Sequence, residues 1–214
     1  MANNHELHMS PKPSALTKLI DSASASGDPH AATTIQILHN LQHQHLWTSL
    51  QIHDLPTPSS TKDSSPDAHV RTLISGVPPH RVYTHPDEQL YMLEQGLRDD
   101  DLKPERMFVI PTAQGQSWSL GRMAAVFDAQ SGIQVTQSES TQSESEPEFA
   151  GGNEVDSEKA KKLEEYYARR EKANATKEWG SKRMLLAMVD RGMGGDGTVV
   201  YYIVQEGEVK PRQN

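Results

Sequence analysis

The chain has 214 residues, a net charge of −8, no cysteine and a mean hydropathy of −0.69. The charge argues against a chain that wraps nucleic acid by neutralising phosphates along its length, and the lack of cysteine excludes disulfides and thiolate metal ligands. Only 35% of the residues are hydrophobic, and no run approaches the roughly 20 apolar residues of a membrane span. We expect one domain of about 100 to 150 residues, long solvated stretches and a reducing compartment.

The N-terminal part changes character near His30. Residues 1–30 are rich in Ser, Ala, Pro and His, and we predict a disordered tail there. The next segment places apolar side chains at helical spacing, which predicts a helix with one buried stripe: Ile35, Leu38, Leu41, His45 and Leu46. Alternation over residues 50–53 predicts a strand, and residues 70–75 predict a second strand that ends at Gly76.

The middle of the chain alternates between helix and strand patterns. Residues 85–97 predict a short helix with an inward stripe of leucines: Leu90, Leu93 and Leu97. Residues 105–112 predict a third strand. Residues 117–129 predict a helix capped by Ser119, again with an inward stripe: Leu120, Met123, Ala124 and Phe127.

The last part begins with a polar stretch. Residues 130–158 are acidic and nearly free of large apolar residues, so we predict a disordered insertion there. Residues 159–179 contain helix formers of mixed charge without a continuous apolar stripe, which predicts an exposed helix or one that forms against a partner. Residues 183–190 and 198–204 predict two final strands. The pattern favours a single small α/β domain with a mixed sheet flanked by helices, built from two stretches: 31–129 and 180–214.

Candidate ligand-binding residues are few. His39 and His43 have a spacing that could suit a metal, but no third ligand accompanies them, so we predict no metal site and no cofactor. The sequence "GMGGDG" lacks the Lys-Ser/Thr ending and the following helix of a phosphate loop, and a turn between strands explains it better. A basic cluster in residues 159–179, diluted by glutamates, is either a solvated face or an RNA contact through four side chains: Lys161, Lys162, Arg169 and Arg170.

Four stretches resemble one known family. They read "HPDEQLYMLEQGL", "ERMFVIPT", "WSLGRMAAVFDA" and "KRMLLAMVDRGMGGDGTVVYYIVQEGEVKPRQN". They are similar to the fungal form of subunit fifteen, the smallest of the four subunits of the eukaryotic tRNA-splicing endonuclease, over roughly residues 30–129 and 180–214. The resemblance implies a fold like the C-terminal domain of archaeal splicing endonucleases and a structural role in a complex that excises introns from precursor tRNA. The expected location is the nucleus or, as in some fungi, the mitochondrial surface.

The resemblance also implies which residues a catalytic member would need. Active members of that family cleave RNA with a tyrosine, a histidine and a lysine, in that chain order. Lys182 stands near the position of the lysine, but the last histidine is His85, far upstream, so we predict no catalytic residue in this chain. One alternative is a self-sufficient or homodimeric ribonuclease that uses Lys182 with Tyr83 and His85. Another is an adaptor whose acidic insertion recruits other factors.

Partners follow from the resemblance as well. In the family the final strands of two subunits pair in one continuous sheet, and the apolar character of both faces suits such a seam: Thr198, Val199, Val200, Tyr201, Tyr202, Ile203 and Val204. The implied partner is the thirty-four-type catalytic subunit, and a two-type catalytic and a fifty-four-type structural subunit would complete a heterotetramer. The preceding loop acts in the family as an acidic plug, and here it supplies Asp190 and Asp196.

Overall fold

The computed structural model describes residues 12–25, 29–55, 72–133, 154–190, 198–206 and 208–211. The helices in this part are α1 (Ala15–Ala25), α2 (Pro29–His43), α3 (Pro86–Gln95), the 3-10 helix η1 (Asp99–Asp101), α4 (Leu120–Gly132) and α5 (Glu154–Thr176). The strands are β1 (Thr48–Asp54), β2 (Thr72–Val77), β3 (Met107–Ala113), β4 (Arg183–Asp190), β5 (Thr198–Gln205) and β6 (Glu208–Pro211).

The strands of the described part form one six-stranded sheet in the order β1-β2-β3-β4-β5-β6. Neighbours are antiparallel except β3 and β4, which are parallel. A parallel pair needs a long crossover, and α4 and α5 lie between β3 and β4 in the chain. The predicted α/β domain with a mixed sheet and helices is therefore confirmed, and β6 is an additional strand that the sequence analysis did not predict.

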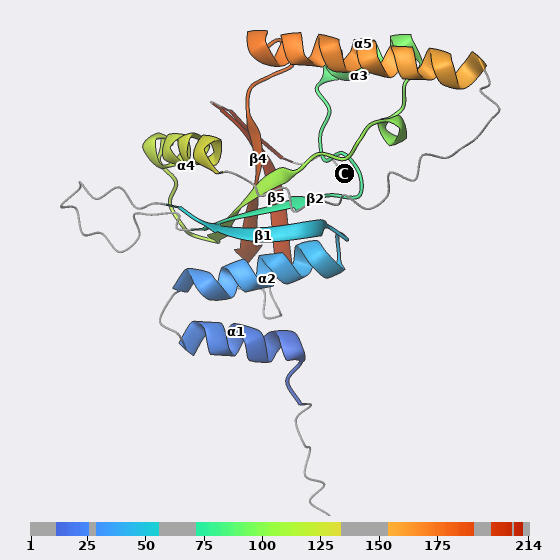
Figure 1. The fold of residues 1–214 in the computed structure, drawn as a ribbon. Coiled ribbons are helices and arrows are strands. Elements are labelled where there is room, and N and C mark those ends of the chain that lie inside the picture. Colours follow the sequence, from blue (N-terminus) through green and yellow to red (C-terminus); the bar gives the residue numbers. More distant parts are fainter. Residues whose placement is uncertain are drawn as a thin grey trace, which may run out of the picture.

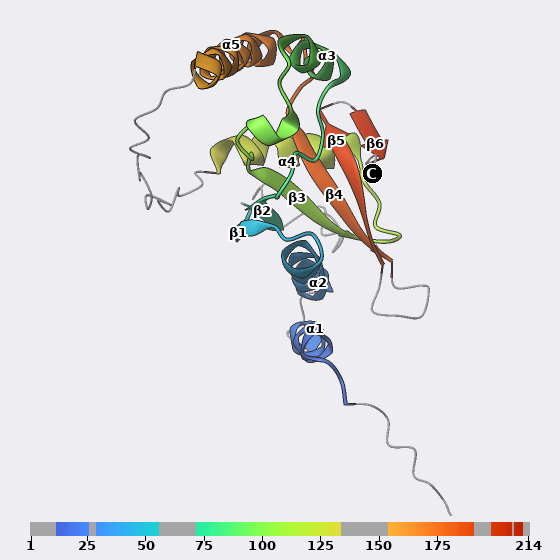
Figure 2. The ribbon, with the colours of Figure 1, turned by 90° about the vertical axis from the view of Figure 1, so that its right-hand side faces the viewer.

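Helices cover both faces of the sheet (Figures 1 and 2). On one face α2 packs Ile37 and Leu41 against the central strands, where the buried partners are Ile74, Val109, Leu185, Ala187, Val189 and Ile203. On the other face α4 packs Val126 and Phe127 against Leu73, Ile110, Met184 and Val204. Consecutive strand residues supply opposite faces because side chains alternate along a strand, so the strands are apolar on both sides.

The remaining helices lie at the two ends of the domain. Figures 1 and 2 show α1 outside α2, and α3 beside α5 at the far end. A third apolar cluster joins α3, α5 and the segments that follow them: Met92, Leu97, Leu102, Tyr166, Ala173 and Trp179. The predicted helix over residues 159–179 is confirmed as far as Thr176, where α5 ends, and it is anchored to its own chain through this cluster.

The predicted inward stripes of the helices were partly wrong. On α3 the side chains of Leu90 and Leu93 are 57% and 67% exposed, because the face that meets α5 carries Glu88 and Met92 instead. On α4 Ser119 does cap the first turn by accepting from the backbone N–H of Arg122 at 3.1 Å.

The predicted apolar stripes of two other helices are each wrong at one end: at the start of α4 and at the end of α2. Leu120, at the first residue of α4, is 90% exposed, since Val126 and Phe127 on the later turns meet the sheet. Leu46 is exposed because α2 ends at His43, before that residue.

The predicted disordered segments need correction as well. Within residues 1–30 the chain forms α1, whose first turn is capped by Ser14 accepting from the N–H of Thr17 at 3.1 Å. The predicted disordered insertion 130–158 is wrong at both ends, because α4 continues to Gly132 and α5 begins at Glu154; residues 134–153 lie outside the described residues. None of the helices in the described part is both long and apolar enough to cross a membrane.

Candidate functional site

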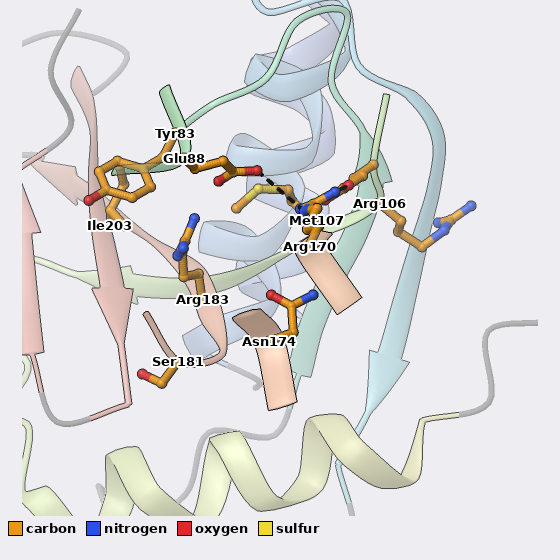
Figure 3. Close-up of a pocket in the computed structure, with 10 residues that line it drawn as sticks. Tyr83, Glu88, Arg106, Met107, Arg170, Asn174, Ser181, Arg183 and Ile203 are labelled. Carbon is orange, nitrogen blue, oxygen red and sulfur yellow. Dashed lines mark hydrogen bonds and ion pairs between the residues drawn. The ribbon is translucent and has the colours of Figure 1, made fainter. Parts of the chain in front are cut away.

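A buried glutamate lies where α3, α5 and the segment before α3 meet. Glu88, 1% exposed, accepts a hydrogen bond from the hydroxyl of Tyr166 at 2.6 Å and one from Arg81 Nη2 at 3.0 Å. Arg170 Nε stands 3.3 Å from the same carboxylate oxygen, and Figure 3 marks this contact. Three donors, two from α5 and one from the segment before α3, therefore converge on one carboxylate, which ties α5 to α3.

Local sequence places Glu88 at that point. His85 is the N-cap of α3 and accepts from the N–H of Asp87 at 3.3 Å, while Pro86 suits the first turn. Gly96 ends the helix in the left-handed region with φ of 69°. Because Glu88 and Met92 are four residues apart, they share one helical face, and that face meets α5.

The electrostatics of the cluster favour the ionised forms of Glu88 and Arg81 and the neutral form of Tyr166. Burial alone would raise the pKa of Glu88, but the hydrogen bond from Tyr166 and the charges of Arg81 and Arg170 outweigh it, so the pKa lies below its usual value. Burial and the bond to Glu88 raise the pKa of Tyr166. Burial opposes the charge of Arg81, yet Glu88 more than offsets it and the pKa of Arg81 is raised. A carboxylate held in this way suits a structural tie better than proton transfer near neutral pH.

Further charged side chains lie next to the hydrogen bonds and ion pairs of Glu88. Glu105, on the segment before β3, forms ion pairs with Arg170 and, at 3.8 Å, with Arg81. Arg183, the first residue of β4, stacks its guanidinium 4.8 Å from the centre of the Tyr83 ring and donates to the backbone carbonyl of Trp179. The cluster as a whole therefore holds more arginine than glutamate.

The predicted partner-strand residues form β5. Backbone pairing with β4 runs along all of β5, from Thr198 opposite Asp190 to Gln205 opposite Arg183. On the other edge β6 pairs with residues 202–205, and no strand of the described part pairs with that edge of residues 198–201. Of the seven predicted interface residues, Tyr201, Ile203 and Val204 are buried, Val199, Val200 and Tyr202 are half-buried and Thr198 is exposed.

The two predicted acidic-loop residues fall on either side of a boundary. Asp190 ends β4 and is half-buried, opposite Thr198. Asp196 lies outside the described residues, with the whole turn 191–197. The prediction of an acidic plug stays a prediction.

The predicted RNA-contacting side chains do not act as one group. Arg170 turns inward to Glu88 and Glu105, and Arg169 pairs with Glu178 at 2.5 Å. Lys161 and Lys162 lie exposed on α5. The two lysines thus remain on the solvent side as the prediction expected, Arg169 is half-buried and paired, and Arg170 faces inward.

The three residues of the alternative ribonuclease prediction make separate contacts with other parts of the chain. Lys182 Nζ donates to Ser131 Oγ of α4 at 2.5 Å. Tyr83 packs under Arg183, and His85 caps α3. Adjacent residues of an extended chain point to opposite sides, so Lys182 and Arg183 address different faces of the sheet.

The histidine pair shows no third ligand in the described residues. The rings of His39 and His43 lie 4.4 Å apart on α2. Across the described ranges, no three His, Cys, Asp or Glu side chains come together as a metal site would require.

Sequence reasoning missed the Glu88 cluster. The sequence pattern predicts only a short helix around Glu88 and a mixed-charge helix around Tyr166, and it does not connect the two. The signal that could have found the cluster is weak: a glutamate one turn before Met92, on the helical face that lacks leucine.

Fold and site together define a small mixed-sheet α/β domain that is tied by a buried ion-pair cluster and in which, among the described residues, part of one edge of β5 has no strand partner. The chain matches the family model described as Sen15 protein over residues 36–143 and 154–214. It is 34% identical over 203 residues to the probable tRNA-splicing endonuclease subunit tsp-1 of Neurospora crassa, covering 90% of this chain and 70% of that relative. The chain therefore belongs to the Sen15 family, which confirms the resemblance drawn from its sequence. No solved structure matches it.

Proposed function

We propose that this chain is a non-catalytic subunit of a tRNA-splicing endonuclease, and that it supports cleavage of introns in precursor tRNA by pairing β5 with a catalytic subunit. Membership of the Sen15 family and the name of the Neurospora crassa relative support the splicing role. The observation that carries the pairing is the edge of β5, which β6 covers at residues 202–205, while at residues 198–201 no strand of the described part pairs with it. An open strand edge is a template for a second chain.

The side chains beside residues 198–201 also suit an interface with a partner strand. Val200 lies opposite Met188, and Tyr202 lies opposite Leu186, so these four share the α4 face of the sheet. All four are only half-buried in the isolated chain. A partner strand at residues 198–201 would extend the sheet and cover this apolar strip.

The seam is tested with Val200→Glu in a chain that is co-expressed with its thirty-four-type partner. A carboxylate in a covered apolar strip loses hydration without gaining a partner, so we expect at least about tenfold less partner to co-purify. The matched control is Ile52→Glu on β1, which lies at the opposite edge of the sheet and is 48% exposed. Circular dichroism checks that both variants fold.

Two results would contradict the seam. One is full recovery of the partner with folded Val200→Glu, and the other is a loss confined to Ile52→Glu. Deletion of residues 198–214 is a poorer test, because β5 lies between β4 and β6 and its loss would damage the sheet itself.

The non-catalytic role is tested in the assembled complex with Lys182→Ala and His85→Ala. Lys182 bonds to Ser131 and His85 to the first turn of α3, so neither is placed as an acid or base by the described contacts. We expect the rate of precursor-tRNA cleavage at saturating complex to stay within about twofold of the wild-type rate, less than the 100-fold or more typical of a lost general acid or base. A fall of 100-fold in either variant with the complex intact would show that this chain contributes to catalysis.

A further inference from the structure

A cavity of about 470 Å³, which we call the α2 cavity, lies between α1, α2 and the first residues of β5. α1 contributes Leu16 to its lining, and β5 contributes Val199. The other lining residues repeat at helical spacing along α2 and just past its end: Gln36, His39, Asn40, His43 and Gln44. His43 and Gln44 are exposed, so the cavity opens to solvent at the end of α2. Figures 1 and 2 show α1 stacked on α2, with α2 next to the sheet.

Hydrogen bonds hold the walls of the α2 cavity in place. Asn40 Oδ1 accepts a hydrogen bond from the hydroxyl of Tyr201 at 2.6 Å, which ties α2 to β5 beside the cavity. The amide nitrogen of Asn40 in turn donates to Gln44 Oε1. The rings of His39 and His43, on the same helix, lie 4.4 Å apart. A side chain that enters the cavity therefore meets preorganised walls, and little affinity is lost to their ordering.

The α2 cavity adjoins the part of β5 where no strand of the described part pairs. Val199 belongs to residues 198–201 and stands opposite Val189 of β4, on the face of the sheet that α2 covers. Side chains alternate along a strand, so every second residue of a strand added there would point to this face. Side chains directly opposite one another in paired strands stand about 5 Å apart, hence a partner side chain opposite Val199 would reach the cavity.

We propose that the α2 cavity receives one tyrosine or tryptophan side chain from the strand of the catalytic subunit that pairs with residues 198–201. The inference rests on the proposed function and adds to it the side chain by which the partner is selected. In strand addition the backbone hydrogen bonds give affinity for an extended chain, and pockets for alternate side chains give specificity. A cavity next to the pairing edge is therefore the place where one partner strand is distinguished from another.

The lining of the cavity determines the chemistry of that side chain. None of the described lining residues is Asp, Glu, Lys or Arg, so a charged side chain would lose hydration without gaining an ion pair. Leu16 and Val199 supply methyl groups, while Gln36 and Asn40 supply amides, which an aliphatic side chain would leave without a polar contact. Tyr and Trp combine a large apolar ring with one hydrogen-bonding group, and both are enriched among the anchors of protein interfaces.

His39→Glu tests the cavity in the full chain, co-expressed with its thirty-four-type partner. The incoming ring would take a carboxylate at this position out of water, so we expect about tenfold less partner to co-purify. His80→Glu is the matched control and should leave recovery unchanged, because His80 is exposed on the segment before α3 and is not part of the cavity lining. Circular dichroism checks that both variants fold.

A photo-reactive benzoylphenylalanine in place of His43, at the exposed rim of the cavity, identifies the occupant in the assembled complex. We expect a cross-link to the catalytic subunit next to a Tyr or Trp in the strand that pairs with β5. Replacing that partner residue by Ala should weaken binding at least about 30-fold, the loss typical of an interface anchor.

Three results would overturn the proposal. The first is a cross-link that stays within this chain or is absent from an intact complex, the second is a cross-linked segment with neither Tyr nor Trp, and the third is full recovery of the partner with folded His39→Glu. If Val200→Glu lowers recovery while His39→Glu does not, the cavity proposal alone fails and the seam stands. If neither variant lowers recovery, the strand pairing itself fails.

Discussion

At the scale of single residues, the burial of Glu88 explains the orientation of α3, which the apolar pattern alone predicts wrongly. Two leucines of α3 face solvent while a carboxylate is buried, and this is stable only because Tyr166, Arg81 and Arg170 satisfy that carboxylate. A charge buried with partners costs little while the set is complete and much when one member is lost. The orientation of α3 therefore depends on an ion pair and a hydrogen bond as much as on its apolar face.

Glu88→Gln tests this dependence. The substitution leaves the buried charge of Arg81, whose side chain is 7% exposed, without its nearest carboxylate, so we expect a loss of about 3 kcal/mol in the free energy of unfolding at pH 7. The pKa of Glu88 lies below its unfolded value of 4.5, so its stabilisation is fully present above pH 4.5 and is lost as pH falls through the folded pKa. The gap between wild type and variant should be constant from about pH 6 to 8 and shrink in acid.

Urea unfolding at several pH values measures that gap. Glu94→Gln serves as the control, because Glu94 stands on the exposed face of α3 and the same charge is removed there. Equal losses for the two variants, or a gap that persists unchanged at pH 3, would refute a stabilising role for the ionised Glu88.

At the scale of elements, the junction of α2, β1 and β2 rests on a close approach at Gly76. Trp47 follows α2 and is buried over this strand position. A Cβ at Gly76 would lie 2.7 Å from Leu50 Cδ2 and 3.0 Å from Trp47 Cε3, closer than packed side chains tolerate. The lack of a side chain at this position lets the end of α2 and the first strand settle on the sheet.

Gly76→Ala should therefore destabilise the chain by about 1–3 kcal/mol, the range for overpacking a well-packed core. The measurement is the urea midpoint at constant m. Gly121→Ala, on α4 where an added Cβ meets nothing within 4 Å, should cost nothing measurable. If the two alanine variants proved equally stable, the close approach at β2 would not constrain the fold.

At the scale of the whole molecule, the sheet could be predicted and the ends of the domain could not. The strands could be predicted because neighbouring residues such as Val109 and Ile110 are both apolar and point to opposite faces of the sheet. This pattern is typical of strands covered by helices on both sides. The packing of α5 leaves no such trace, since its inward face mixes Tyr166 and Ala173 with Arg170. β6 is short and polar, and only its pairing with β5 defines it.

The candidate site could likewise be predicted from the sequence only in part. The family could be reached from sequence because it rests on contiguous residues, and the proposed role of β5 as an interface rests on the same stretch. The charge cluster joins Arg81, Glu88 and Tyr166, and the bond between Tyr166 and Glu88 spans 78 residues, so no local spacing reveals it.

The outermost helix provides a test of where the domain begins. α1 lies outside α2 and buries only Ala23, whereas no residue of α1 belongs to the apolar clusters of the sheet. Removing residues 1–25 should cost less than about 2 kcal/mol of burial, which for a chain of this size lowers Tm by less than about 8 °C. Tyr166→Ala, which empties the fully buried core of the α3–α5 end, should cost about 3–5 kcal/mol and a larger fall. Calorimetry on both variants decides: a truncated chain that no longer unfolds cooperatively would make α1 part of the core.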